Sequence, residues 1–113
     1  MTRITEDTIQ ICFHEWCKKQ PFVLASWHVA NERATSAKQG AYLKRKGVLK
    51  GCWDYWVIVN TPAIISIEFK ASGGVLSKEQ IEFGKVLEKA HIPHKVCYSA
   101  YEATQFMKKI MEE

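Results

Sequence analysis

Residues 63–70 read AIISIEFK, and residues 50–60 read KGCWDYWVIVN. Both stretches are rich in β-branched and aromatic residues, and a Thr-Pro turn separates them, so they predict the two strands of a hairpin. Because both strands are apolar on both faces, we expect a sheet that helices cover on each side. Against that background the charged residues Asp54, Glu68 and Lys70 need an explanation, since burying a charge costs free energy.

The two acids of this hairpin are expected to face each other. With the turn centred near Thr61 and Pro62, Asp54 lies directly opposite Glu68, and alternation places Lys70 on the same side as Glu68. Carboxylates about 4 Å apart repel by about 4 kcal/mol at an effective dielectric constant of about 20. A divalent cation between them would convert that repulsion into binding, beside a lysine suited to phosphodiester cleavage. The alternative is a cross-strand salt bridge between Lys70 and one carboxylate.

Composition is that of an ordinary globular chain. Of the 113 residues, 47% are hydrophobic and 25% are charged, so we expect a single domain over residues 1–113. No apolar run approaches the roughly 20 residues that a membrane span needs, and the polar start Met1-Thr2-Arg3 is unlike a signal peptide. We therefore expect a cytoplasmic protein with no membrane partner. The cysteines lack CxxC spacing and are predicted to be buried free thiols.

Apolar periodicity and capping signals predict the elements around the hairpin. Thr5, followed by two acids, starts one helix, and Ser77 with Gln80 forms a capping box that starts another. The predicted elements are a helix from Thr5 to before Pro21, a strand over 22–30, a helix over 31–46, strands over 50–60 and 63–70, a helix from Ser77, a strand over 95–99 and a helix from Ser99. Their order, α-β-α-β-β-α-β-α, predicts an α/β fold in which a mixed sheet is flanked by helices.

The first helix offers a further acid, Glu15. The buried stripe expected for this helix consists of Ile9, Cys12, Phe13 and Trp16. Glu15 lies about 60° from Cys12 around the helix axis, at the edge of that stripe. We therefore expect its carboxylate to point into a cleft beside the core. A solvated glutamate at the helix edge is the alternative.

Basic residues cluster in the segment 38–50. The segment contains no acid, and its lysine and arginine residues are Lys38, Lys44, Arg45, Lys46 and Lys50. Such a cluster is a candidate surface for the phosphates of a nucleic acid, even though the formal net charge of the chain is only +4. A solvated helix face is again the alternative.

The order and spacing of these motifs resemble a known family, the VRR-NUC domain of the PD-(D/E)XK nuclease superfamily. The residues that carry the resemblance are His14-Glu15, Asn31-Glu32, Gly47, Gly51-Cys52-Trp53-Asp54, Glu68-Phe69-Lys70 and Leu76-Ser77-Lys78-Glu79-Gln80. They extend over nearly the whole chain, from Glu15 to about Ala103. The resemblance implies a restriction-endonuclease-like sheet. One departure is Trp53, which stands where the family usually has a proline before the aspartate.

The resemblance also implies roles for individual residues. The catalytic residues that it implies are Glu15, Asp54, Glu68, Lys70 and Gln80. Asp54, Glu68 and the backbone carbonyl of Phe69 would bind Mg²⁺ or Mn²⁺, and Glu15 would complete the metal environment directly or through water. Lys70 would assist the attacking water or stabilise the transition state. The residues that would contact nucleic acid are Lys44, Arg45, Lys46, Lys50 and Lys78.

The activity implied by the resemblance is a metal-dependent, structure-selective DNA endonuclease linked to DNA repair. Such proteins are similar to homodimeric enzymes that act on branched DNA, including Holliday junctions, in a bacterial cell or a phage-infected host. No small-molecule organic cofactor is expected. Two alternatives stay open: a restriction or recombination nuclease of the same superfamily, and a non-catalytic DNA-binding module. A missing carboxylate or lysine would favour the module, and neither is missing.

Overall fold

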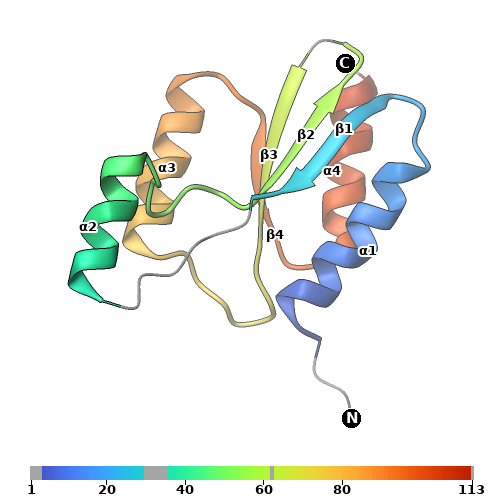
Figure 1. Ribbon diagram of the computed structural model, residues 1–113. Coiled ribbons are helices and arrows are strands. Elements are labelled where there is room, and N and C mark those ends of the chain that lie inside the picture. The colour runs from blue at the N-terminus through green and yellow to red at the C-terminus, as the bar shows by residue number, and fades with distance from the viewer. Residues whose placement is uncertain (1–3, 30–35, 62, 113) are drawn as a thin grey trace.

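Figure 1 shows a computed structural model of the chain, which describes residues 4–29, 36–61 and 63–112. Its elements are α1 (Glu6–Lys18), β1 (Val23–His28), α2 (Ala37–Lys46), β2 (Tyr55–Val59), β3 (Ala63–Phe69), α3 (Lys78–Lys89), β4 (His94–Cys97) and α4 (Ala100–Glu112). This order confirms the predicted α-β-α-β-β-α-β-α arrangement. The motif pair Asn31-Glu32 and the first part of the helix predicted over 31–46 lie outside the described residues.

The strands of the described residues form one mixed sheet in the order β1-β2-β3-β4. β2 pairs antiparallel with both β1 and β3, whereas β3 and β4 run parallel. In the hairpin, Val59 pairs with Ala63 and Tyr55 pairs with Ile67. One further step along this register places Asp54 opposite Glu68, which is the predicted arrangement. The strand predicted over 50–60 is nevertheless too long, because β2 begins only at Tyr55.

Helices lie on both faces of the sheet, as predicted (Figure 1). α1 and α4 cover one face, where the ring of Phe13 lies 5.4 Å from that of Tyr55 and 5.5 Å from that of Phe69. α3 covers the other face, where the ring of Phe83 lies 6.2 Å from that of Trp56. Consecutive residues of β2 therefore point to opposite layers of helices, as strand geometry requires.

The buried stripe of α1 differs from the predicted one. The N-cap is Thr5 as expected, and its hydroxyl accepts a hydrogen bond from the backbone N–H of Thr8 at 3.1 Å. The buried residues, however, are Ile9, Phe13 and Cys17. This row at i, i+4 and i+8 turns Cys12 outward, so Cys12 is an exposed thiol rather than a buried one.

The other cysteines follow the sequence expectation more closely. Cys17 and Cys97 are buried and Cys52 is half-buried, and all of them are free thiols. Burial raises the pKa of Cys97 to about 12, which makes this thiol unreactive at neutral pH. Across residues 4–29, 36–61 and 63–112, we find no helix with the length and apolar character needed to cross a membrane.

Candidate active site

Glu68 lies at the centre of the candidate site, on the α3 side of β3. Its side chain is only 2% exposed. Oε1 accepts a hydrogen bond from the backbone N–H of Asp54 at 3.2 Å, and Oε2 accepts one from Nε2 of Gln80 at 3.2 Å. Nζ of Lys70 lies 3.9 Å from Oε2. The structure thus brings together four of the predicted site residues, which come from β3 and from the starts of β2 and α3.

The surroundings of Glu68 disfavour the ionised form of its carboxylate. Burial, the largest cause, and the charge of Asp54 raise the pKa of Glu68 from 4.5 to about 7. The N–H of Asp54 and the ammonium of Lys70 lower the pKa of Glu68, but by less than burial and the charge of Asp54 raise it. The salt bridge of the alternative interpretation is present, since Nζ of Lys70 lies 3.9 Å from Oε2 of Glu68, yet the pKa of Glu68 stays raised. A divalent cation bound at Glu68 would favour its ionised form.

The backbone that carries Asp54 is fixed from both sides. The carbonyl of Asp54 accepts a hydrogen bond from the N–H of Val29 at 2.6 Å, at the end of β1. The indole of Trp53 is buried and donates from Nε1 to the carbonyl of Gln80 at 2.9 Å. The indole of Trp56 donates in turn to the carbonyl of Trp53 at 2.9 Å. The indole of Trp53 therefore ties the start of β2 to α3.

Gln80 combines the two roles that the sequence left open. Its Oε1 accepts a hydrogen bond from the N–H of Ser77 at 2.9 Å, and its own N–H donates to the hydroxyl of Ser77 at 3.1 Å. This is the predicted capping box at the start of α3. The other end of the same amide donates to Glu68. Because the capping box fixes the amide, Gln80 holds the buried carboxylate in one orientation.

The donor groups at this site suit a hard divalent cation. Among the described residues, no three His, Cys, Asp or Glu side chains are grouped closely enough to bind a metal ion by themselves. The candidate ligands are instead the carboxylates of Asp54 and Glu68 with the main-chain carbonyl of Phe69, which lies between Glu68 and Lys70 in the chain. All are oxygen donors, and Mg²⁺ or Mn²⁺ bound by few protein ligands keeps several waters. The pair of carboxylates therefore fits such an ion.

Glu15 is not brought to this site. The inward face of α1 is centred on Phe13, and at about 100° per residue Glu15 lies about 160° from it. The Glu15 carboxylate is exposed and forms an ion pair with Nζ of Lys18 at 3.2 Å. The sequence analysis placed Glu15 near the core because it assumed that Cys12 was buried. Packing on the Ile9–Phe13–Cys17 row rotates the helix and turns Glu15 to solvent.

A second acid of α1 is Glu6, which lies in the first turn of the helix and is exposed. It precedes Phe13 by seven positions, which places it about 20° from the centre of the inward face. Its charge adds to the effects that raise the pKa of Glu68. A spacing of seven residues, about two helical turns, from Phe13 indicates Glu6 in the sequence. The acidic first turn was instead interpreted only as a helix start.

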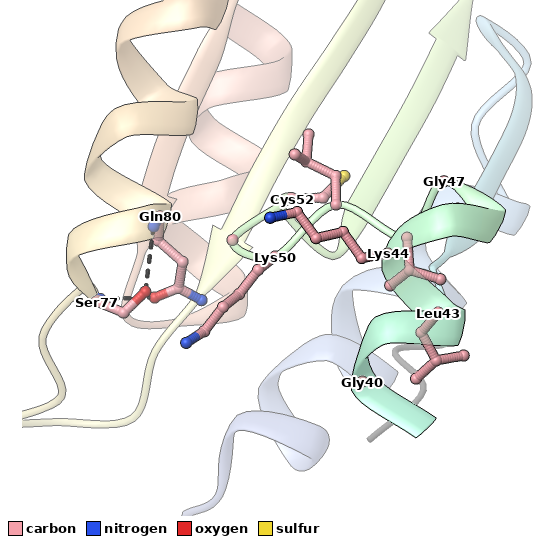
Figure 2. A pocket seen from close by; sticks show the side chains of 11 residues that line it. Gly40, Leu43, Lys44, Gly47, Lys50, Cys52, Ser77 and Gln80 are labelled. Carbon is pink, nitrogen blue, oxygen red and sulfur yellow. Dashed lines mark hydrogen bonds between the residues drawn. The ribbon is translucent and has the colours of Figure 1, made fainter. Parts of the chain in front are cut away.

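The predicted basic residues divide into a pocket group and a surface group. Lys44 and Lys50 line a pocket of about 790 Å³ between α2, the segment 47–52 and the start of α3. Figure 2 shows both lysine side chains between α2 and the turn that carries Ser77 and Gln80. The surface group consists of Arg45, Lys46 and Lys78, all exposed.

The pocket opens next to the acid pair. Gln80, which holds Glu68, belongs to its lining, and so does Cys52. Burial raises the pKa of the Cys52 thiol, and the charges of Asp54 and Glu68 raise it further. Cys52 is therefore close enough to both acids to sense their charge, which places one end of the pocket beside them.

No protein-family model matches this sequence, and no curated protein matches it. Among solved structures, the fold is similar to that of a protein described as "VRR_NUC domain protein", with a TM-score of 0.76. The similarity covers 96% of this chain and 89% of that chain, at 21% sequence identity. The chain therefore has the fold of a VRR_NUC domain protein, as the resemblance of its motifs predicts.

Proposed function

We propose that this protein belongs to the VRR-NUC family and is a divalent-metal-dependent endonuclease that hydrolyses phosphodiester bonds in DNA. The observation that carries the proposal is the buried carboxylate of Glu68, which accepts from the backbone N–H of the half-buried Asp54 and has Lys70 beside it. Removing the carboxylate of Glu68 from water and placing it near a second acid is unfavourable, and an apolar residue would serve the core better. Such a pair is retained at functional sites, where perturbed pKa values cluster.

Asp54, Glu68 and the carbonyl of Phe69 would hold the metal ion. When bound there, Mg²⁺ or Mn²⁺ would neutralise phosphate charge and lower the pKa of a water molecule. Lys70, whose side chain is 13% exposed, is sheltered enough to orient that water and to offset charge that develops on the phosphate. Gln80 would keep Glu68 in its binding orientation.

Glu6 would take the role that the resemblance assigned to Glu15. Helical periodicity places Glu6 on the Phe13 side of α1, and although it is exposed its charge helps to raise the pKa of Glu68, whereas Glu15 lies on the opposite side of the helix. It would complete the metal environment through a bound water. This assignment places the outer acid at the N-terminal end of α1 rather than near its C-terminal end.

Branched DNA is the proposed substrate, with Holliday junctions as the first example to test. The support is the resemblance of the motif series, together with the basic residues around the pocket that adjoins the acids. A homodimer would present two sites related by a twofold axis, which suits paired cuts in a symmetric junction. A restriction-type or recombination nuclease would share the chemistry and differ in the DNA that it cuts.

Cleavage assays test this proposal directly. Purified protein is incubated with linear duplex, single strands and an immobile four-way junction, with Mg²⁺ or Mn²⁺ or with EDTA. We expect paired cuts near the branch point that need the metal. Cuts at a fixed sequence in linear duplex would favour the restriction alternative, and binding without cutting under every metal condition would refute the nuclease proposal.

A matched set of variants tests the assigned roles. Glu68→Ala and Lys70→Ala are expected to keep DNA binding and lose cleavage. Glu6→Ala is expected to lower the cleavage rate by about 10–100-fold, as removal of an outer residue of a metal site does. Glu15→Ala is the control on the opposite side of the same helix and should cut at the wild-type rate. Equal rates for Glu6→Ala and Glu15→Ala would contradict the role of Glu6.

A further inference from the structure

We propose that the pocket between α2, the segment 47–52 and the start of α3 binds a single unpaired nucleotide of the DNA strand next to the bond that is cut. The inference rests on the proposed nuclease function, because it names the feature of the substrate that brings DNA to the acid pair. The apolar wall of the pocket consists of side chains to which the motif resemblance assigns no role, and its lysines are ones to which the resemblance assigns only contacts with nucleic acid.

The chemistry of the pocket matches the two halves of a nucleotide. Leu43, Val48 and Leu49 form an apolar wall, and Lys44 and Lys50 supply positive charge at the same cavity. The volume of about 790 Å³ is within the range of cavities that hold ligands of nucleotide size, about 300–1,000 Å³. An apolar wall suits the face of a base, and the ammonium groups suit its phosphate.

A base within a duplex has no free face that could contact this apolar wall. In a duplex, each base is stacked between its neighbours, and a protein that binds only the backbone needs positive charge without a cavity. The exposed wall residue Leu49 is 60% accessible, so apolar surface is available for an incoming group. Only an unpaired or extruded base presents a free face that can cover this wall.

The position of the pocket places that nucleotide at the acids. Gln80 lines the pocket and donates to Glu68 at 3.2 Å. Cys52, also in the lining, precedes Asp54 by two residues. A nucleotide in the pocket would therefore have its neighbouring phosphodiester beside Asp54 and Glu68. An unpaired nucleotide is present at flaps, bulges and branch points, so the pocket would favour DNA with such features.

The loop geometry keeps the positive charge at the start of α3. Gly51 has a φ of 87°, and a Cβ there would clash with the backbone of Glu79. The absence of a side chain lets Lys50 approach this helix end, where its Nζ lies 3.2 Å from Oε1 of Glu79. The N-terminus of α3 adds its own positive potential. A phosphate entering the pocket would compete with Glu79 for Lys50.

The test measures DNA binding in EDTA, so that it does not depend on cleavage. Fluorescence anisotropy compares a perfect duplex with the same duplex carrying one unpaired nucleotide, and a 2-aminopurine at that position reports whether the base enters an apolar site. We expect the wild-type protein to bind the unpaired nucleotide about tenfold more tightly, because contact with one base face is worth about that much. Equal affinities for the two duplexes would overturn the inference.

Two leucine variants provide the matched comparison. Leu49→Glu places a charge on the pocket wall, and Leu24→Glu places one on β1, where the side chain is similarly exposed at 66%. Leu49→Glu should lose the preference for the unpaired nucleotide, while Leu24→Glu should keep it. An unchanged preference in Leu49→Glu would overturn the inference. So would equal binding of an unpaired abasic nucleotide, because the pocket would then bind phosphate alone.

Cleavage in Mg²⁺ or Mn²⁺, measured separately, distinguishes the two proposals. Cutting without any preference for the unpaired nucleotide would overturn the inference about the pocket and leave the nuclease function standing. A tenfold preference without cutting under any metal condition would refute the nuclease function. The pocket would then remain a nucleotide-binding site, but its proposed place beside a cleaved bond would be overturned.

Discussion

Replacing Glu68 with glutamine should stabilise the protein at pH 8 when divalent cations are absent. The carboxyl of Glu68 has its ordinary pKa of 4.5 in the unfolded chain and a pKa of about 7 in the folded protein, because burial and the charge of Asp54 disfavour its ionised form. The folded state therefore holds this proton more tightly than the unfolded state does. The glutamine variant has nearly the same shape but cannot ionise.

The sign and size of the effect follow from proton linkage. Since the folded pKa is raised, the stability that the protonated carboxyl contributes is fully present below pH 4.5 and is lost as the pH rises through 7. Each pKa unit corresponds to about 1.4 kcal/mol, so the whole shift corresponds to about 3 kcal/mol. Most of that loss falls between pH 5 and pH 8. It is large against a typical unfolding free energy of about 5–15 kcal/mol.

Chemical denaturation in EDTA at a series of pH values measures this effect. Between pH 5 and pH 8, the free energy of unfolding of the wild-type protein should fall by about 2–3 kcal/mol more than that of Glu68→Gln. Glu15→Gln, at an exposed surface ion pair, should keep the wild-type profile. Parallel profiles for wild type and Glu68→Gln would show that Glu68 is not a buried acid with a raised pKa, and the reasoning would fail.

Three further outcomes are expected. At pH 8, Mn²⁺ at about 100 times its dissociation constant should raise the unfolding free energy of the wild-type protein by about 2.7 kcal/mol, and excess EDTA should reverse the gain; no gain would argue against the metal site. The Gly51→Ala substitution should lower the free energy of unfolding more than Gly47→Ala does, because both glycines have a positive φ but only Gly51 lies against Glu79. Equal decreases for the two variants would contradict that close approach. Trp53→Phe keeps an aromatic ring but loses the hydrogen bond to the Gln80 carbonyl, so the free energy of unfolding should fall by about 1 kcal/mol. The cleavage rate should fall by a larger factor than this loss of stability explains. A wild-type cleavage rate would show that the indole does not position the site.

Short-range patterns in the sequence were sufficient to predict the central hairpin and its acid pair. The apolar strands around a short turn fix the register, and the register places Asp54 opposite Glu68. The capping box of Ser77 and Gln80 is likewise a local signal. Such features are predictable because the residues involved are neighbours in the chain or are linked by one tight turn.

The rotation of α1 was not predictable in the same way. Helical periodicity gives the angles between side chains, but it does not say which side of the helix meets the sheet. Packing of Phe13 between the rings of Tyr55 and Phe69 decides this, and these residues are distant in sequence. That rotation turns Glu15 away from the sheet and leaves Glu6, itself exposed at the start of the helix, on the Phe13 side of α1.

The sequence by itself thus determined the order of elements, the hairpin register and the candidate residues Asp54, Glu68, Lys70 and Gln80. Only the tertiary structure decided that one amide of Gln80 serves both Ser77 and Glu68, that the indole of Trp53 ties the start of β2 to α3, and that the pocket opens beside the acids. The physical reason is the separation along the chain of the residues that interact. Hairpin and capping signals act over a few residues, whereas burial, and the pKa shifts and cavities that it creates, depends on segments that meet only when the helices pack onto the sheet.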